Sequence, residues 1–185
     1  MPVVHHKQEF PPLLAQGFHE MSVGELRGFC VEGFPDSLRR QEIMAGFELI
    51  HEQLELLSFT GEIWVDGSFL TKKLEPDDID FVVMMPSAFY DSGTEDQKQF
   101  IEWLVNNEDD PKKSFRCHTD VGLLYESSHP FWSLTVETLR HWEHDVYGYS
   151  VATREPKGIV IVKLPTVPQV LPVESGTVVR EGAEP

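Results

Sequence analysis

Residues 63–81, IWVDGSFLTKKLEPDDIDF, are the part of the sequence around which the predicted fold is built. Residues 62–65 are apolar and β-prone, and residues 78–83 alternate between acidic and apolar side chains before they become fully apolar. Gly67 and Ser68 follow the first run, where small residues let a backbone bend sharply. The pattern therefore predicts two strands joined by a turn that begins at Gly67.

The acidic residues of the second predicted strand give the first indication of a site. Side chains on a strand alternate between its two faces, so Asp78 and Asp80 should share one face. Ile79 and Phe81 should enter the core on the other face. Two neighbouring carboxylates repel each other unless a cation lies between them. Oxygen ligands of this kind suit Mg²⁺ or Mn²⁺, so the sequence predicts a divalent metal site here.

At these residues the chain resembles the nucleotidyltransferase superfamily of polymerase-beta type. That superfamily has an apolar strand followed by Gly-Ser or Gly-Gly, a spacer of about nine to thirteen residues, and an acidic-apolar-acidic triplet. Here Gly67-Ser68, nine intervening residues and Asp78-Ile79-Asp80 fit that spacing. The resemblance rests on the ordered combination, because a single Asp-Xaa-Asp occurs in many surface loops.

The resemblance also implies a third acid on a later strand. The candidate is Asp120, within the β-prone run CHTDVGLL. Strand alternation puts Thr119 and Val121 on the opposite face and His118 on the same face as Asp120. One residue departs from the superfamily pattern: Asp66 precedes the glycine, where an apolar residue is more usual.

More narrowly, the chain resembles a small bacterial family of nucleotidyltransferase-like proteins of unknown function. The matching pieces are GFHEMSVGELRGFC, WVDGSFLTKKLEPDDID and PKGIVIVKL, and they cover most of residues 17–164, the expected domain. The fold implied is α+β, a nucleotidyltransferase-like mixed β-sheet backed by helices. Residues 1–16 are then an N-terminal lead. Residues 165–185 lack hydrophobic periodicity, so we expect a disordered tail.

The resemblance further implies a reaction and the residues that perform it. With Mg²⁺ or Mn²⁺, an NTP, with ATP as the first candidate, would donate a nucleoside monophosphate to a hydroxyl of a protein, an RNA or a small molecule. The catalytic and metal-binding candidates are Asp78, Asp80 and Asp120. The phosphate-binding candidates are Gly67, Ser68, Lys72 and Lys73. The two lysines fit an ordinary exposed turn equally well.

Two other functions stay open on the sequence. Small relatives in the superfamily often act as partners of a second protein, including toxin-antitoxin pairs in which a minimal nucleotidyltransferase modifies a HEPN-type ribonuclease. The chain would then be a regulatory or antitoxin-type partner, with or without catalysis. The third alternative is an unrelated α+β protein whose acids merely lie on its surface.

Length and composition restrict the class of protein. The chain has 185 residues, of which 41% are hydrophobic, and this is enough for one substantial core. Its net charge of −16 makes non-specific nucleic-acid binding unfavourable. Its apolar runs fall short of the roughly 20 residues that span a bilayer. Two cysteines, Cys30 and Cys117, are too few for a disulfide framework, so we expect a cytoplasmic protein.

Hydrophobic periodicity and capping residues predict the remaining elements. Helices are expected over residues 22–30, 36–57, 94–107 and 131–146. Further strands are expected over residues 116–125 and 158–164, and a loop over residues 86–93.

Overall fold

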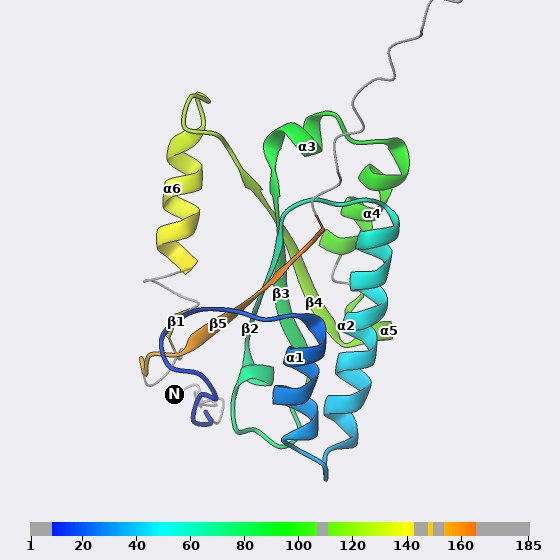
Figure 1. The fold of residues 1–185 in the computed structure, drawn as a ribbon, viewed down its shortest axis with the longest axis vertical. Coiled ribbons are helices and arrows are strands. Elements are labelled where there is room, and N and C mark those ends of the chain that lie inside the picture. Colours follow the sequence, from blue (N-terminus) through cyan, green and yellow to red (C-terminus); the bar gives the residue numbers. More distant parts are fainter. Residues whose placement is uncertain (1–8, 107–110, 143–147, 150–153, 166–185) are drawn as a thin grey trace, which may run out of the picture.

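The computed structural model describes residues 9–106, 111–142, 148–149 and 154–165, and it shows an α+β fold built on one mixed sheet (Figure 1). The strands are β1 (Gly17–Glu20), β2 (Glu62–Asp66), β3 (Ile79–Pro86), β4 (Cys117–Leu124) and β5 (Gly158–Lys163). The α-helices are α1 (Val23–Arg27), α2 (Leu38–Leu56), α3 (Ser87–Asp91), α4 (Glu95–Val105), α5 (Lys112–Phe115) and α6 (Trp132–Arg140).

The strand order is β1-β5-β2-β3-β4. The central strand β2 is antiparallel to both of its neighbours, β5 and β3. The two outer pairs are parallel, β1 with β5 and β4 with β3. Because β4 runs parallel to β3, the chain must cross over between them, and α4 lies in that crossover. Strand β2, which leads into the Gly67 turn, is thus at the centre of the sheet.

Strand alternation divides the apolar side chains between two faces of the sheet. On one face, Val65 of β2 and Phe81 of β3 join a core with α1, α2 and α4, represented by Phe47 of α2. On the other face, Trp64 of β2 and Val82 of β3 belong to a smaller cluster beside α6. Figure 1 shows α2 and α4 on one side of the sheet and α6 on the other. Side chains with the parity of Trp64 therefore face away from the main core.

The long helix predicted over residues 36–57 is confirmed as α2. Its N-cap is Ser37, whose hydroxyl accepts a hydrogen bond from the backbone N–H of Arg40 at 3.2 Å. The strands predicted over residues 62–65 and 116–125 are confirmed as β2 and β4, within about two residues at each end. The strand predicted over residues 78–83 is confirmed as β3, which extends farther, to Pro86. The expected loop at residues 86–93 is wrong, because residues 87–91 form the short helix α3.

Two parts of the N-terminal region differ from expectation. Strand β1 was not predicted, since four residues of half-buried pattern give little local signal. The expected lead packs on the domain from about Pro11 onward: the N–H of Leu13 donates to the carbonyl of Leu70 at 2.9 Å, and Pro12 pairs with Thr71. These contacts lie beside the Gly67 turn, so residues 11–13 help to hold it.

Two predictions extend beyond the described residues. Helix α6 ends at Arg140, and residues 143–147 of the predicted helix lie outside the described part of the chain. The predicted tail also falls there, from residue 166 onward. None of the helices described by the structure is long and apolar enough to cross a bilayer.

Candidate functional site

The turn after β2 has a backbone that only glycine tolerates well. Gly67 has φ +85° and ψ −166°, a region that L side chains rarely adopt. A Cβ atom added there would lie 1.9 Å from Oδ2 of Asp80. The Asp80 carboxylate therefore lies directly against the backbone of the turn, and any larger residue at position 67 would displace it.

The acid facing Asp80 across the strands is Asp66. The two residues are register partners in the antiparallel β2–β3 pair. Asp66 is only 4% exposed, and Nζ of Lys157 lies 2.8 Å from its Oδ1 and 3.0 Å from its Oδ2. The hydrogen bond runs to Oδ2, whereas the contact with Oδ1 is an ion pair without hydrogen-bond alignment.

Burial raises the pKa of the Asp66 carboxyl above its ordinary value, and Lys157 opposes that rise. The charge of Asp80 raises the same pKa further, although less strongly. Two acids of the sheet are thus electrostatically coupled, and a lysine that enters from the chain just before β5 balances the buried one. Neither Asp66 nor Lys157 was among the predicted site residues.

Asp80 also meets the neighbouring strand β4. His118 is its register partner, and Nδ1 of His118 lies 3.0 Å from Oδ1 of Asp80. Asp120 lies two residues farther along β4, opposite Val82. The exposed side chains of His118 and Asp120 alternate with the buried Cys117 and Thr119. Asp66, Asp80, His118 and Asp120 consequently share the face of the sheet that carries α6.

Asp78 has a different environment from Asp80. Strand β3 begins at Ile79, so Asp78 lies immediately before the strand. The Asp78 carboxylate lies 3.4 Å from Nζ of Lys112. Asp78 and Asp80 therefore have different ion-pair partners, Lys112 and His118, and the acid opposite Asp80 in the β2–β3 register is Asp66.

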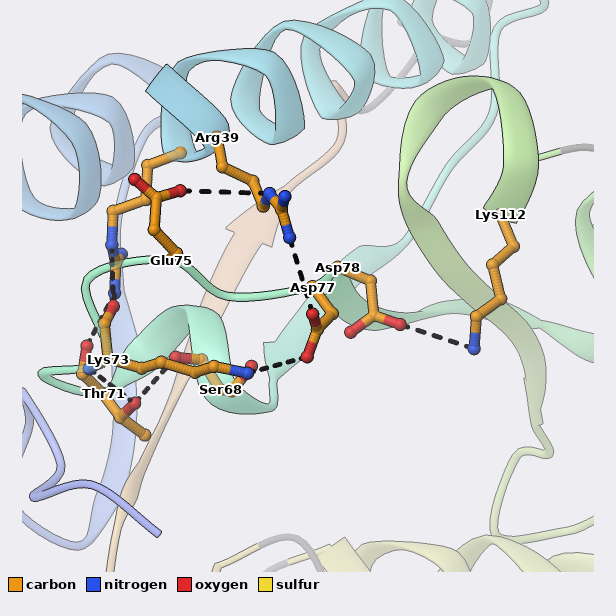
Figure 2. A network of polar contacts seen from close by, with 9 residues as sticks. Arg39, Ser68, Thr71, Lys73, Glu75, Asp77, Asp78 and Lys112 are labelled. Atoms are coloured by element: carbon orange, nitrogen blue, oxygen red, sulfur yellow. Dashed lines mark hydrogen bonds and ion pairs between the residues drawn. The ribbon is translucent and has the colours of Figure 1, made fainter. Parts of the chain in front are cut away.

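Charged side chains of the loop between Gly67 and β3 form ion pairs with each other and with neighbouring helices (Figure 2). Nζ of Lys73 lies 2.7 Å from Asp77, and Arg39 of α2 approaches Asp77 at 3.6 Å. Figure 2 shows Asp77 and Asp78 turned toward different cations, one toward Lys73 and the other toward Lys112. Lys73 would have to leave Asp77 before it contacted a ligand at the turn.

Ser68 and Lys72 are placed by backbone contacts. The carbonyl of Ser68 accepts a hydrogen bond from the Thr71 hydroxyl at 2.8 Å, which closes a short 3₁₀ turn over residues 68–70. The N–H of Lys72 donates to the carbonyl of Pro11 at 2.8 Å, while the lysine itself is exposed. Of the four predicted phosphate-binding residues, Gly67 and Ser68 therefore lie at the turn beside Asp80.

The predicted metal ligands fit a divalent cation in part. Carboxylate oxygens are the donors that Mg²⁺ prefers, and Asp80 and Asp120 present them on one face with side chains at least a third exposed. Asp78 fits less well, because it would first have to leave Lys112. Among the described residues, no three or more histidine, cysteine, aspartate or glutamate side chains are grouped closely enough to hold a metal ion.

Sequence reasoning also missed Arg40 of α2. Its side chain is fully buried and donates hydrogen bonds to four backbone carbonyls, three of which belong to the loop after Ser68. One signal for it is present in the sequence: Arg40 continues the apolar stripe of Ile43, Phe47 and Ile50 by one further helical step. A charged residue on a buried stripe indicates a specific set of partners.

The family match covers all of this geometry. A model described as a family of unknown function, DUF6932, matches residues 7–163. The chain belongs to DUF6932. The matched region of this DUF6932 member contains the five strands that the structure describes, the Gly67 turn, Arg40 and Lys157. No curated protein and no solved structure matches the chain.

Proposed function

We propose that this DUF6932 protein is a Mg²⁺- or Mn²⁺-dependent nucleotidyltransferase. It would take an NTP, ATP in the first instance, and transfer the nucleoside monophosphate to a hydroxyl of a protein, an RNA or a small molecule. The observation that supports the proposal is the contact between the positive-φ turn at Gly67 and the Asp80 carboxylate, with Asp120 on the same face of the next strand. The sequence resemblance requires this order of strand, turn, acid and later acid.

Each residue would have a separate task in that reaction. Gly67 lets phosphate oxygens approach the main chain, and the Ser68 hydroxyl would donate a hydrogen bond to one of them. Asp80 would provide most of the protein's contact with the divalent cation, which when bound neutralises phosphate charge, and Asp120 would complete the set of ligands. The acceptor oxygen would form a bond to the α-phosphorus as the bond to pyrophosphate breaks. Asp120 would receive the acceptor's proton.

Substitution of the two acids tests the proposal. Asp80→Asn should abolish the Mg²⁺-dependent thermal shift that an NTP gives the wild type. Asp120→Asn should keep most of that shift but slow transfer from an α-labelled NTP by orders of magnitude, since it acts on the nucleophile. Asp91→Asn is the matched control, because Asp91 is an exposed acid of α3 beyond the far end of β3. A wild type that responds to none of the four NTPs with Mg²⁺ or Mn²⁺ would refute the proposal.

A second candidate is a nucleotidyltransferase-like regulatory or antitoxin-type partner without catalysis. It is favoured by the ion pairs that Asp66 and Asp78 already make with Lys157 and Lys112. Binding of Mg²⁺ and ATP without transfer to the chain itself, to RNA or to a co-encoded protein would support this candidate. A neighbouring gene for a HEPN-like helical ribonuclease would identify the protein to test as partner.

A further inference from the structure

Arg40 is a buried cation whose hydrogen bonds all go to backbone carbonyls. Nη1 donates to Cys30 at 2.9 Å and to Phe69 at 2.8 Å. Nη2 donates to Thr71 and Lys73 at 2.7 Å each, and Nε donates to Lys73 at 3.2 Å. A guanidinium has five N–H donors, and these contacts use all of them.

The positive charge of Arg40 has no carboxylate partner in the part of the chain that the structure describes. The nearby acid Glu75 acts on it only at a distance, and its own ion-pair contact, at 3.9 Å, is with Arg39. The guanidinium lies 3.8 Å from the centre of the Phe34 ring, so stacking also shields it from water. Burial lowers the pKa of the guanidinium, and the group remains charged at neutral pH.

An apolar residue would fill this position at lower electrostatic cost. Burying a charge without an opposite charge is unfavourable, and apolar replacements of buried ionic groups are often neutral or stabilising. What an apolar residue cannot do is hold several carbonyls in one arrangement. Three of the four carbonyls belong to alternate residues of one loop, Phe69, Thr71 and Lys73, directly after Gly67 and Ser68.

We propose that Arg40 is a positioning residue that fixes residues 67–73 as a preformed binding loop for the phosphates of an NTP. This inference rests on the proposed function for its ligand. The guanidinium fork orients the carbonyls inward, and its uncompensated charge lies under a loop whose ligand would be a polyanion. Lysine cannot replace it, since three donors on one nitrogen cannot reach four carbonyls spread over residues 30 to 73.

The test compares full-length Arg40→Lys and Arg40→Met with a matched Arg39→Lys control. Arg39 is the adjacent residue of α2 and contacts Glu75 and Asp77, which directly follow the proposed binding loop, but its side chain is 40% exposed. Circular dichroism first identifies a temperature at which all variants are folded. Hydrogen exchange is then measured for residues 68–74. Dissociation constants are measured for Mn²⁺ alone and for Mn²⁺ with ATP.

We expect both Arg40 variants to speed exchange in residues 68–74 but not in α4, and to weaken Mn²⁺·ATP binding by about tenfold to hundredfold. Mn²⁺ alone should bind as in the wild type, because its ligands lie on other segments. Arg39→Lys should change none of these quantities. If Arg40→Met does not fold, Arg40→Lys carries the test.

Two results would overturn the inference. One is an Arg40→Lys variant that folds with unchanged loop exchange and unchanged Mn²⁺·ATP affinity. The other is an equal loss of affinity for Mn²⁺ alone and for Mn²⁺·ATP, which indicates a general structural role. Failure of the proposed function looks different, because the wild type itself would then bind no NTP. In that case the phosphate role of Arg40 is rejected, whether or not exchange in the loop increases.

Discussion

The buried ion pair between Asp66 and Lys157 gives a stability prediction that does not depend on any activity. Lys157→Met keeps most of the volume of the side chain and removes its charge. Asp66 is 4% exposed and the Lys157 side chain is 12% exposed, so little water is available to replace the lost partner. Removing one member of a buried pair typically costs about 3–5 kcal/mol, because it leaves a buried charge without compensation.

Protonation of Asp66 limits that cost. Neutralising a carboxyl with an ordinary pKa of 3.8 at pH 7 costs about 4.4 kcal/mol, at about 1.36 kcal/mol per pH unit. Lys157→Met therefore cannot lose more than this amount of unfolding free energy, because beyond it Asp66 would take up a proton and become neutral. We expect Lys157→Met to lower the free energy of unfolding by about 3 kcal/mol, or the melting temperature by about 6–12 °C.

The loss should also depend on pH, with a sign that follows from the pKa of Asp66. Burial already raises that pKa in the folded state, and removing Lys157 raises it further. A group with a raised folded pKa contributes stability below its unfolded pKa and loses that contribution as pH rises through the folded pKa. The deficit of Lys157→Met should thus be smaller at about pH 5.5 than at about pH 8.

Urea unfolding of four proteins measures the effect: wild type, Lys157→Met, Asp66→Asn and the double variant. The double variant should recover much of the loss, because it has no buried unpaired charge. Lys163→Met, at the end of β5, is the matched control, since Lys163 pairs with Glu20 at an exposed position and its loss should change little. A loss below about 1 kcal/mol, or a double variant no more stable than Lys157→Met, would refute the reasoning.

Two further substitutions test the turn and a helix cap. Gly67→Ala should destabilise the protein by about 1–3 kcal/mol, because residue 67 has a φ of +85° and an added Cβ would collide with Asp80. The matched control is Gly24→Ala in α1, where a Cβ meets nothing within 4 Å, and it should be neutral or stabilising by up to about 1 kcal/mol. Equal effects of the two changes in chemical denaturation would contradict this. Thr94→Ala should cost about 1 kcal/mol, because the Thr94 side chain caps α4 in a reciprocal pair with Gln97; an unchanged unfolding midpoint would argue against the cap.

Local patterns in the sequence were sufficient to predict most of the sheet. The alternation around Phe81 and the glycine at position 67 predicted two strands and their turn, and the structure confirms both strands and shows the positive φ. The period of α2 was equally clear, because its apolar stripe and its Ser37 cap agree. These features depend on residues within one turn or one strand of each other, which is the range over which a pattern is informative.

The predicted site was less complete because its contacts are set by pairing between distant segments. The register that puts Asp66 opposite Asp80 is fixed by the β2–β3 pairing, and the ion pair of Asp78 with Lys112 depends on where α5 lies beside the start of β3. Lys157 reaches Asp66 from 91 positions away in the sequence, and no local motif marks it. Arg40 differs, since its place on the apolar stripe of α2 can be read from the sequence, whereas its carbonyl partners in the loop cannot.

The cations found by the structure bear on how a ligand would bind. The chain carries a net charge of −16, yet basic residues from three different segments lie at this site. Arg40 of α2 contacts the loop after Gly67, Lys112 of α5 contacts Asp78 at the start of β3, and Lys157, just before β5, contacts Asp66 at the end of β2. In the ligand-free protein, Lys112 and Lys157 balance the charges of Asp78 and Asp66, and Arg40 donates hydrogen bonds to carbonyls of the loop. A divalent cation or a triphosphate arriving at Asp78 or at Lys73 must therefore exchange with an existing ion pair. Lys112→Met should consequently strengthen Mn²⁺ binding if Asp78 is a metal ligand. It should leave Mn²⁺ binding unchanged if Asp80 and Asp120 suffice, so this comparison decides whether Asp78 belongs to the metal-binding residues.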